Sequence, residues 1–293
     1  RLLSFRAAAE ELSLTQSAIS RQIQSLEEEI GCTLFLRGTR KVELSTDGAQ
    51  LLPTAVAVLS KLDQTVRQIR RTRGRRIVNV STFASFASLW LIPRMEAFQR
   101  EHEDIDIRVS AYDRKVDLEE GESDLALRYD DRPSVPADAE QLFEEMLSPC
   151  VSPWYLQKPP APLKKPADLA GHALAEEDDP RPSAEYLSWR RWLTENGAPD
   201  LQPRRWLYLN FTYQQIQAAL TGQGVALARL PLVHEHVQRG ELVEPFGKQG
   251  RLGSPFSYWL IMGTGAARRP EVQQFAEWVK QQAAITRDAL TGV

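Results

Sequence analysis

The sequence predicts a winged helix-turn-helix module, a long linker helix and an α/β domain of two lobes. Two short amphipathic patterns meet at a tight turn, a long apolar seam follows, and strand-like and helix-like stretches then alternate. The chain has 293 residues, more than one core usually holds. We place the helix-turn-helix at residues 1–45, the linker helix and hinge at 46–75, and the α/β domain at 76–293, with lobes of about 76–150 with 263–293 and of 151–262.

Composition excludes several classes of protein. Apolar residues make up 42% and charged residues 26%, which favours a folded core over disorder. The most apolar stretch, Phe83–Ile92, is shorter than the roughly 20 residues that span a bilayer, so we expect no membrane contact. Cys32 and Cys150 lie far apart, and no secretion signal is visible. These features predict a reduced, cytoplasmic protein.

Charge is distributed unevenly along the chain. Residues 1–76 hold 13 Lys+Arg against 8 Asp+Glu, whereas the remainder holds 23 against 31. A basic segment attached to an acidic body is typical of a nucleic-acid module joined to another kind of domain. The alternative is a solvated basic linker, because six of the thirteen cations fall in 67–76.

Two short helices are expected at the start of the chain. Ser4 can cap a helix that runs to about Leu12, and after a turn a second helix is expected over Gln16–Ile30, where Gly31 stops it. Helices joined in this way form a helix-turn-helix. The positions expected to face inward are Phe5, Ala8, Ala9 and Leu12, then Ala18 or Ile19, Ile23, Leu26 and Ile30.

The other face of the second helix carries side chains that suit DNA. Gln can bond adenine, Arg can bond guanine, and Ser can bond bases or phosphates. The predicted DNA-binding residues of this helix are Gln16, Ser17, Ser20 and Arg21.

A small hairpin with a basic tip is expected next. The apolar segments 34–36 and 42–44 flank a turn that contains glycine and three cations. Such a wing would lie along the phosphate backbone while the helix enters the major groove. The residues expected to contact phosphates are Arg37, Arg40 and Lys41.

Ser45 is expected to cap a long helix with an apolar seam. Its apolar residues recur at spacings of three and four, as in helices that pair with a partner helix. We therefore expect a dimer through this helix; the alternative is that the seam packs on its own domain. The seam consists of Leu51, Ala55, Val58, Leu62, Val66 and Ile69.

From residue 77 onward, the pattern indicates βαβ units and a mostly parallel sheet. Two similar lobes make the cleft between them the expected ligand site. Strands are expected at 77–81, 105–111, 124–129, 142–151, 206–210, 225–230 and 256–262, and helices at 85–100, 116–120, 212–220, through 236, and 271–284.

The N-terminal segment resembles the winged helix-turn-helix of LysR-type transcriptional regulators. The resemblance implies binding to a dyad-related DNA operator by a homo-oligomer, with a tetramer beyond the dimer. Family members begin with a further helix, so the resemblance also implies that this helix is truncated here. The matching residues are Phe5-x-x-Ala8-Ala9-Glu10-x-Leu12, Leu14-Thr15-Gln16-Ser17-Ala18-Ile19-Ser20-Arg21-Gln22-Ile23-x-x-Leu26-Glu27, Gly31-x-x-Leu34-Phe35-x-Arg37 and Leu44-Ser45-x-x-Gly48.

The body of the chain is similar to the effector domain of the LysR branch that includes regulators of glycine cleavage and of β-lactamase induction. The similarity rests on 85–95, Ile105-Asp106-Ile107 and 124–129. It implies a two-lobed fold like that of periplasmic binding proteins, with a small effector between the lobes. The effector-binding residues that it implies are Thr82, Phe83, Ser85, Phe86, Asp113, Arg128, Tyr129, Phe211, Thr212, Tyr213 and Arg229.

The helices expected to begin near Ser85 and Thr212 would direct free N–H groups toward the cleft, which suits an anion. We therefore hypothesise an anionic metabolite as the effector. For Arg128 and Arg229 the alternative role is a salt bridge. For Phe83, Phe86, Phe211 and Tyr213 the alternative is core or rim packing.

The chemistry of an enzyme is not evident in the sequence. No nucleophile-and-base pattern occurs, and two histidines two apart at 234 and 236 diverge on a helix, so neither catalysis nor a metal site is expected. Gly222-Gln223-Gly224 lacks the third glycine of a dinucleotide loop, so no cofactor is expected. Together with the helix-turn-helix and the two-lobed body, the absence of such patterns predicts a ligand-responsive, DNA-binding regulator. The rival interpretation is a cytosolic solute-binding or metabolic enzyme domain fused to a basic helix pair.

Overall fold

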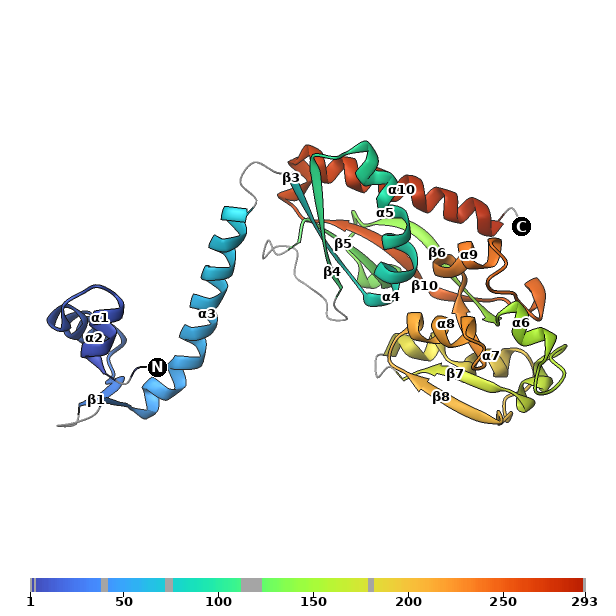
Figure 1. Cartoon of the computed structure of the whole chain (residues 1–293), viewed down its shortest axis with the longest axis horizontal. Coiled ribbons are helices and arrows are strands. Elements are labelled where there is room, and N and C mark those ends of the chain that lie inside the picture. Colours follow the sequence, from blue (N-terminus) through green and yellow to red (C-terminus); the bar gives the residue numbers. More distant parts are fainter. Residues whose placement is uncertain are drawn as a thin grey trace. The chain divides into compact units, whose positions relative to one another are not determined.

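The structure, a computed structural model, divides into two compact units, Arg1–Gly74 and Arg75–Val293 (Figure 1). It describes residues 2, 4–37, 42–71, 76–111, 123–178 and 182–291. The predicted wing-tip cations Arg40 and Lys41, the predicted effector contact Asp113 and the expected helix at 116–120 lie outside these residues.

The first unit opens with the two expected helices, α1 (Phe5–Glu11) and α2 (Gln16–Ile30). The hydroxyls of Ser4 and Thr15 each accept a backbone N–H three residues further on, at 3.2 Å, so each helix begins at a side-chain cap. Gly31 ends α2 in the left-handed conformation with φ of 78°, which glycine adopts without steric strain.

Fewer residues of these two helices are buried than the sequence predicted. Ala9 and Ile19 are buried as expected, but Leu12, Leu26 and Ile30 are 60%, 40% and 46% exposed, so their predicted inward placement is wrong. Helical periodicity marks every apolar position on one side of a helix. The seven residues of α1 can cover only part of the fifteen-residue α2.

The expected hairpin follows as β1 (Phe35–Arg37) and β2 (Val42–Leu44), which pair antiparallel. Glu27 of α2 anchors it, because one carboxylate oxygen accepts the backbone N–H groups of Leu34 (2.7 Å) and Phe35 (3.0 Å). The hairpin is therefore hydrogen-bonded to the helix that precedes it.

The long helix α3 spans Thr46–Arg71. The Ser45 hydroxyl accepts the N–H of Gly48 at 2.9 Å, which confirms Ser45 as the cap. A Cβ on Gly48 would lie well inside 3.0 Å of the Leu34 carbonyl oxygen, so glycine permits this close approach. Large apolar side chains exposed along α3 are Leu51, Leu52, Val56, Val58, Leu59, Leu62 and Val66.

One eight-stranded sheet forms the centre of the second unit, in the order β4-β3-β5-β10-β6-β9-β7-β8. Neighbouring strands are parallel at one end of the sheet, β4-β3-β5, and at the other end, β9-β7-β8. Between these ends, β10 and β6 run antiparallel to their neighbours. The strands are β3 (Arg76–Thr82), β4 (Ile105–Ala111), β5 (Leu125–Asp130), β6 (Glu140–Cys150), β7 (Ala173–Glu177), β8 (Arg205–Leu209), β9 (Val225–Arg229) and β10 (Leu252–Met262).

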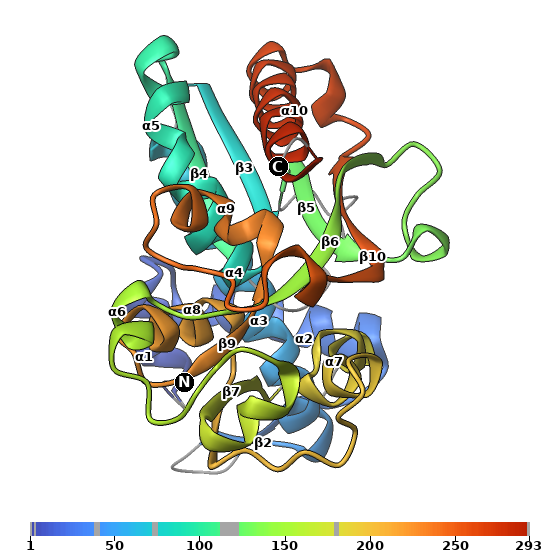
Figure 2. The ribbon, with the colours of Figure 1, turned by 90° about the vertical axis from the view of Figure 1, so that its right-hand side faces the viewer.

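The helices group with the two ends of this sheet. α5 and α10 lie with β3, β4 and β5, whereas α6, α7 and α8 lie with β7 and β9 (Figure 2). A π-helical segment, Ala87–Leu91, joins α4 to α5 in one continuous helix. The α-helices are α4 (Ala84–Phe86), α5 (Ile92–Glu101), α6 (Pro153–Gln157), α7 (Trp189–Glu195), α8 (Thr212–Leu220), α9 (Leu230–Gln238) and α10 (Pro270–Thr291).

Two apolar clusters fill this unit. The larger one includes Phe86, Trp90 and Phe275, and the smaller one includes Trp189 and Trp192 of α7. Neither α7 nor β7 was expected from the sequence: α7 has only seven residues, and β7 ends in two glutamates. In the described part of the chain, no helix is long and apolar enough to cross a membrane.

Candidate DNA-binding and effector-binding sites

The polar face of α2 is the candidate DNA-binding surface. Gln16, Ser17 and Arg21 are exposed and Ser20 is half-buried, and their spacing puts them on one side of the helix. The Ser17 hydroxyl pairs with that of Thr15 (3.1 Å). Within the described residues, Arg21 makes no hydrogen bond or ion pair, so its guanidinium is available to a base or a phosphate.

Arg37, the first of the predicted phosphate contacts, ends strand β1. Its side chain is outside the described residues, as are Arg40 and Lys41. Since Glu27 bonds the start of the hairpin, the strand bearing Arg37 is held next to the helix bearing Arg21.

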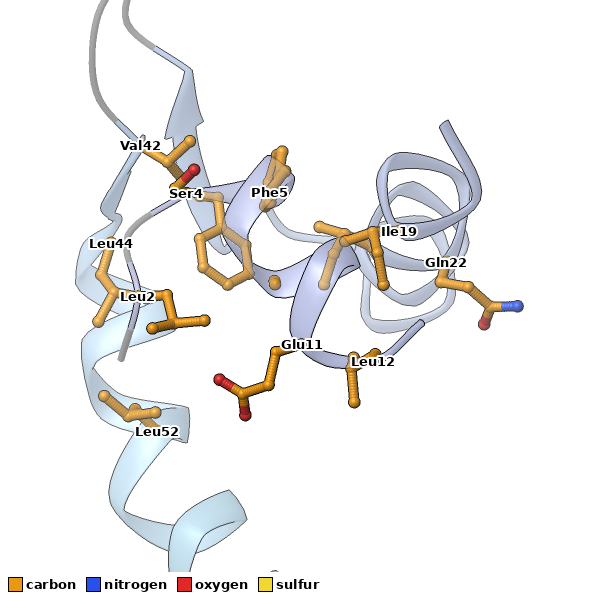
Figure 3. A pocket seen from close by; sticks show the side chains of 13 residues that line it. Leu2, Ser4, Phe5, Glu11, Leu12, Ile19, Gln22, Val42, Leu44 and Leu52 are labelled. Carbon is orange, nitrogen blue, oxygen red and sulfur yellow. The ribbon is translucent and has the colours of Figure 1, made fainter. Parts of the chain in front are cut away.

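The first unit also contains an apolar hollow of about 340 Å³, which sequence reasoning did not identify. Leu2 and Leu12, on either side of α1, come together there with Ile19 of α2, Leu44 of β2 and Leu52 of α3 (Figure 3). A hollow lined mainly by hydrocarbon does not suit an anion.

The candidate effector site lies where the two ends of the sheet meet. We call β3, β4 and β5 with their helices lobe 1, and β7, β8 and β9 with theirs lobe 2. The backbone N–H of Tyr213, in the first turn of α8 of lobe 2, donates to the hydroxyl of Ser85 of lobe 1 at 3.2 Å. Beside it, the Thr212 hydroxyl donates to Glu177 (2.7 Å). Ser85 and Tyr213, both predicted effector residues, therefore join the two lobes directly.

Arg229 is a buried charge at this junction. It ends β9, is 4% exposed, and its Nε donates to the Glu145 carboxylate at 2.6 Å. Its guanidinium carbon lies 4.0 Å from the ring centre of Tyr129, 5.1 Å from that of Tyr258 and 5.4 Å from that of Phe83. The salt bridge considered as its alternative role is thus present.

Glu145 and Tyr258 complete this group, and sequence reasoning missed both. The Tyr258 hydroxyl donates to the same Glu145 oxygen as Arg229, at 2.7 Å. Burial raises the pKa of Glu145 and Arg229 opposes this, while Glu145 in turn raises the pKa of Arg229. The strand pattern contained the missing signal, because alternation puts Glu145 on the buried side with Phe143 and Leu147.

Arg128 lies on the opposite face of the sheet from Tyr129. Tyr129 pairs across the strands with Tyr258, and Arg128 pairs with Trp259. Arg128 donates to the Ser81 hydroxyl (2.7 Å) and has no carboxylate partner among the described residues. Burial lowers the pKa of Arg128. The two predicted arginines therefore do not form one cluster.

The predicted aromatic residues have different surroundings. Phe86 is fully buried between Trp90 and Phe143, so it belongs to the core. Phe211 and Tyr213 are half-buried and stack with 5.5 Å between ring centres. Core packing, the alternative considered above, describes Phe86 best.

Two predicted effector residues leave polar atoms without partners. Within the described residues, Thr82 Oγ1 and Arg229 Nη2 are buried and make no hydrogen bond. Native proteins satisfy most buried polar groups, so such atoms call for an explanation such as a ligand or water. Asp131 Oδ1 and Ser152 Oγ are also unpaired.

The histidines and cysteines of the described residues have separate surroundings. His234 contacts Arg94 (3.3 Å), whereas His236 contacts Glu241 (2.6 Å). The described part of the chain contains no group of three or more metal-ligating side chains. Burial raises the pKa of Cys150, which disfavours its thiolate.

Two sequence families match this chain. Residues 1–49 match the bacterial regulatory helix-turn-helix protein, lysR family, and residues 71–284 match the LysR substrate binding domain. The second match alone covers more than half of the chain.

Individual proteins are similar over nearly the whole chain. The glycine cleavage system transcriptional activator of Escherichia coli K12 is 32% identical over 288 residues, or 98% of this chain and 92% of that protein. The transcriptional activator AmpR of Pseudomonas aeruginosa is 30% identical over 97% of this chain and 92% of its own length. The solved effector domain of the same AmpR superposes with a TM-score of 0.57 and 26% identity, covering 74% of this chain and 100% of that domain.

Proposed function

The chain belongs to the LysR family of bacterial transcriptional regulators, and we propose that it binds a dyad-related operator under the control of an anionic metabolite held between its two lobes. Its architecture is a winged helix-turn-helix followed by an effector-binding domain. It acts as a regulator and not as an enzyme, so a fused enzyme domain is not favoured. We place its action in the cytoplasm, where its DNA is.

The observation that carries the DNA-binding role is the exposed start of α2. Gln16, Ser17, Ser20 and Arg21 lie together there, and the family match spans the helix. Phosphate contacts from Arg37, Arg40 and Lys41 would position the helix in the major groove.

The exposed apolar seam of α3 supports a homodimer. Val58 and Leu62 are each more than half exposed, and burying such side chains against a second helix is favourable. A symmetric dimer presents two equivalent α2 helices, which fits an operator with two related half-sites. Assembly of dimers into a tetramer is the further state that the family resemblance suggests.

The effector proposal rests on polar groups at the junction of the lobes. Thr82, Ser85 and Tyr129 come from lobe 1, whereas Tyr213 and Arg229 come from lobe 2. A ligand held by both sets would change the balance between lobe arrangements and hence the spacing of the DNA-binding modules.

The test uses the whole chain of 293 residues. In a gel-shift assay with its own upstream region, we expect binding that weakens steeply as salt increases, because phosphate contacts release counterions. Binding that is absent or insensitive to salt would contradict the DNA-binding role. For the effector, a thermal-shift screen of metabolites should yield anionic compounds. A ligand at 100 times its dissociation constant adds roughly 2.7 kcal/mol to the free energy of unfolding, which raises the melting temperature.

A further inference from the structure

One glutamate near the end of α2 binds the chain segment that follows the helix. Glu27 is half-buried, whereas its neighbour Glu28 is exposed. The Glu28 carboxylate accepts the side-chain N–H of Gln24, also on α2, at 3.0 Å. Glu27 Oε1 instead accepts the backbone N–H groups of Leu34 at 2.7 Å and Phe35 at 3.0 Å. The carboxylate of Glu27 therefore connects α2 to residues outside the helix.

The same segment is bonded to the start of α3 through its carbonyl groups. The Ser45 hydroxyl donates to the Thr33 carbonyl oxygen at 2.5 Å, and the Ser45 N–H donates to the Leu34 carbonyl oxygen at 2.9 Å. The Ser45 hydroxyl also accepts the N–H of Gly48 and so caps α3. Residues 33–35 are thus bonded both to α2 and to α3.

We call Glu27, Ser45 and the segment 33–35 the bridge. Leu34 is 4% exposed, so its N–H and C=O groups need partners within the protein, and the bridge supplies both. A carboxylate is a strong acceptor of backbone N–H groups, which agrees with the short distance at Leu34. Because both helices are bonded to the backbone of the same three residues, the bridge restricts the angle between α2 and α3.

We infer that Glu27 is a positioning residue that sets the spacing of the two DNA half-sites recognised by the dimer. In the proposed dimer, α3 joins the two copies and α2 enters the major groove, so the angle between these helices determines the distance between the two α2 helices. A fixed angle favours one half-site spacing, because α2 is already oriented before DNA binds. Glu27 acts here through Leu34 and Phe35, without contact to DNA. This inference rests on the proposed binding to a dyad-related operator.

The test compares two DNA duplexes. One carries the operator mapped by footprinting of the native protein on its own upstream region, and the other carries this operator with two base pairs inserted at its dyad centre. The insertion turns the half-sites by about 70° and moves them apart by about 7 Å. Gel-shift titrations of the whole chain at one salt concentration give the ratio of the two dissociation constants. We expect the native protein to bind the lengthened operator at least about tenfold more weakly.

Variants of Glu27 test the bridge directly. Glu27→Ala should lower this ratio at least about threefold, because α2 can then turn to meet the displaced half-site. Glu27→Gln should keep the native ratio, since its amide oxygen can accept the same two N–H groups. Glu28→Ala is the matched control, because it removes the same charge from α2 but breaks a bond within that helix. A native ratio in folded Glu27→Ala, or an equal fall in Glu28→Ala, overturns the inference.

A second variant covers the case in which Glu27→Ala does not fold, as judged by circular dichroism. Ser45→Asp still caps α3, but a carboxylate has no proton to donate to the Thr33 carbonyl oxygen. It should lower the ratio in the same way, and an unchanged ratio overturns the inference. A native protein that binds both duplexes equally rejects this inference alone. A native protein that binds neither duplex, or binds without salt dependence, rejects the proposed function and the inference with it.

Discussion

Arg21 and Arg229 show how one residue type takes opposite roles according to its neighbours. Arg21 is exposed on α2 with no partner among the described residues, so its five N–H donors are free. Arg229 is enclosed by three aromatic rings and bound to Glu145. Both residues were predicted to bind a partner. The exposure of Arg21 follows from helix periodicity alone, whereas the surroundings of Arg229 depend on contacts with other strands.

Replacing Arg21 with Ala should weaken operator binding by about 1–3 kcal/mol if the side chain makes a bidentate contact with a base. A gel-shift titration on the cognate operator measures this. Arg6→Ala is the control, because Arg6 is exposed on α1 and pairs with Glu10. Equal affinity of Arg21→Ala and the native protein would remove Arg21 from base recognition.

Replacing Arg40 with Ala should act on salt dependence. If Arg40 contacts a phosphate, the slope of log affinity against log salt should fall in magnitude by about one, with similar loss on every sequence. Filter binding at four salt concentrations measures the slope. A loss confined to the cognate operator would instead indicate a base contact.

Among the elements, the hairpin and α3 depend on close packing at Gly48. A Cβ there would meet the Leu34 carbonyl oxygen, whereas Gly31 has open space around its α-carbon. Gly48→Ala should therefore lower the free energy of unfolding by about 1–3 kcal/mol through overpacking. Urea denaturation measures the change. Stability equal to that of the native protein would show that α3 can move away from the hairpin.

The contact between α5 and α9 should make stability depend on pH. One ring nitrogen of His234 accepts an N–H of Arg94 at 3.3 Å. Burial lowers the pKa of His234 and Arg94 lowers it further, whereas Glu235, which pairs with Arg94, opposes this. In the unfolded chain a histidine takes up a proton near pH 6.5. As the pH falls below this value the unfolded state binds more protons than the folded state, so the free energy of unfolding decreases.

Unfolding measurements between pH 8 and pH 5 on the native protein and on His234→Phe test this dependence. The native protein should lose more stability than the variant over the interval below pH 6.5. The other three histidines are present in both proteins, so the difference between the two curves isolates His234. Parallel curves for the two proteins would contradict the prediction.

For the whole molecule, the main question is how the exposed seam of α3 is covered. Leu62→Glu should disrupt a dimer through this helix, because it places a charge in an apolar interface. Sedimentation analysis should then show a smaller species, and operator affinity should fall with it. Ser60→Glu is the matched control, since Ser60 is exposed on α3 but off the seam. An unchanged sedimentation profile in Leu62→Glu would place the dimer contact elsewhere.

The sequence by itself determined the elements whose signals are local. Caps at Ser4 and Ser45, the stop at Gly31 and the bounds of α2 and α8 follow from neighbouring residues, so they were predicted correctly. The helix-turn-helix motif is equally local and led to the family.

Only the tertiary structure decided which side chains meet. Glu145, Arg229 and Tyr258 are separated by up to 113 residues, yet they share hydrogen bonds, because β6, β9 and β10 come together where the lobes join. The register between β5 and β10 likewise put Tyr129 opposite Tyr258. Such contacts depend on strand order and pairing over long distances in sequence, which periodicity within one segment does not contain.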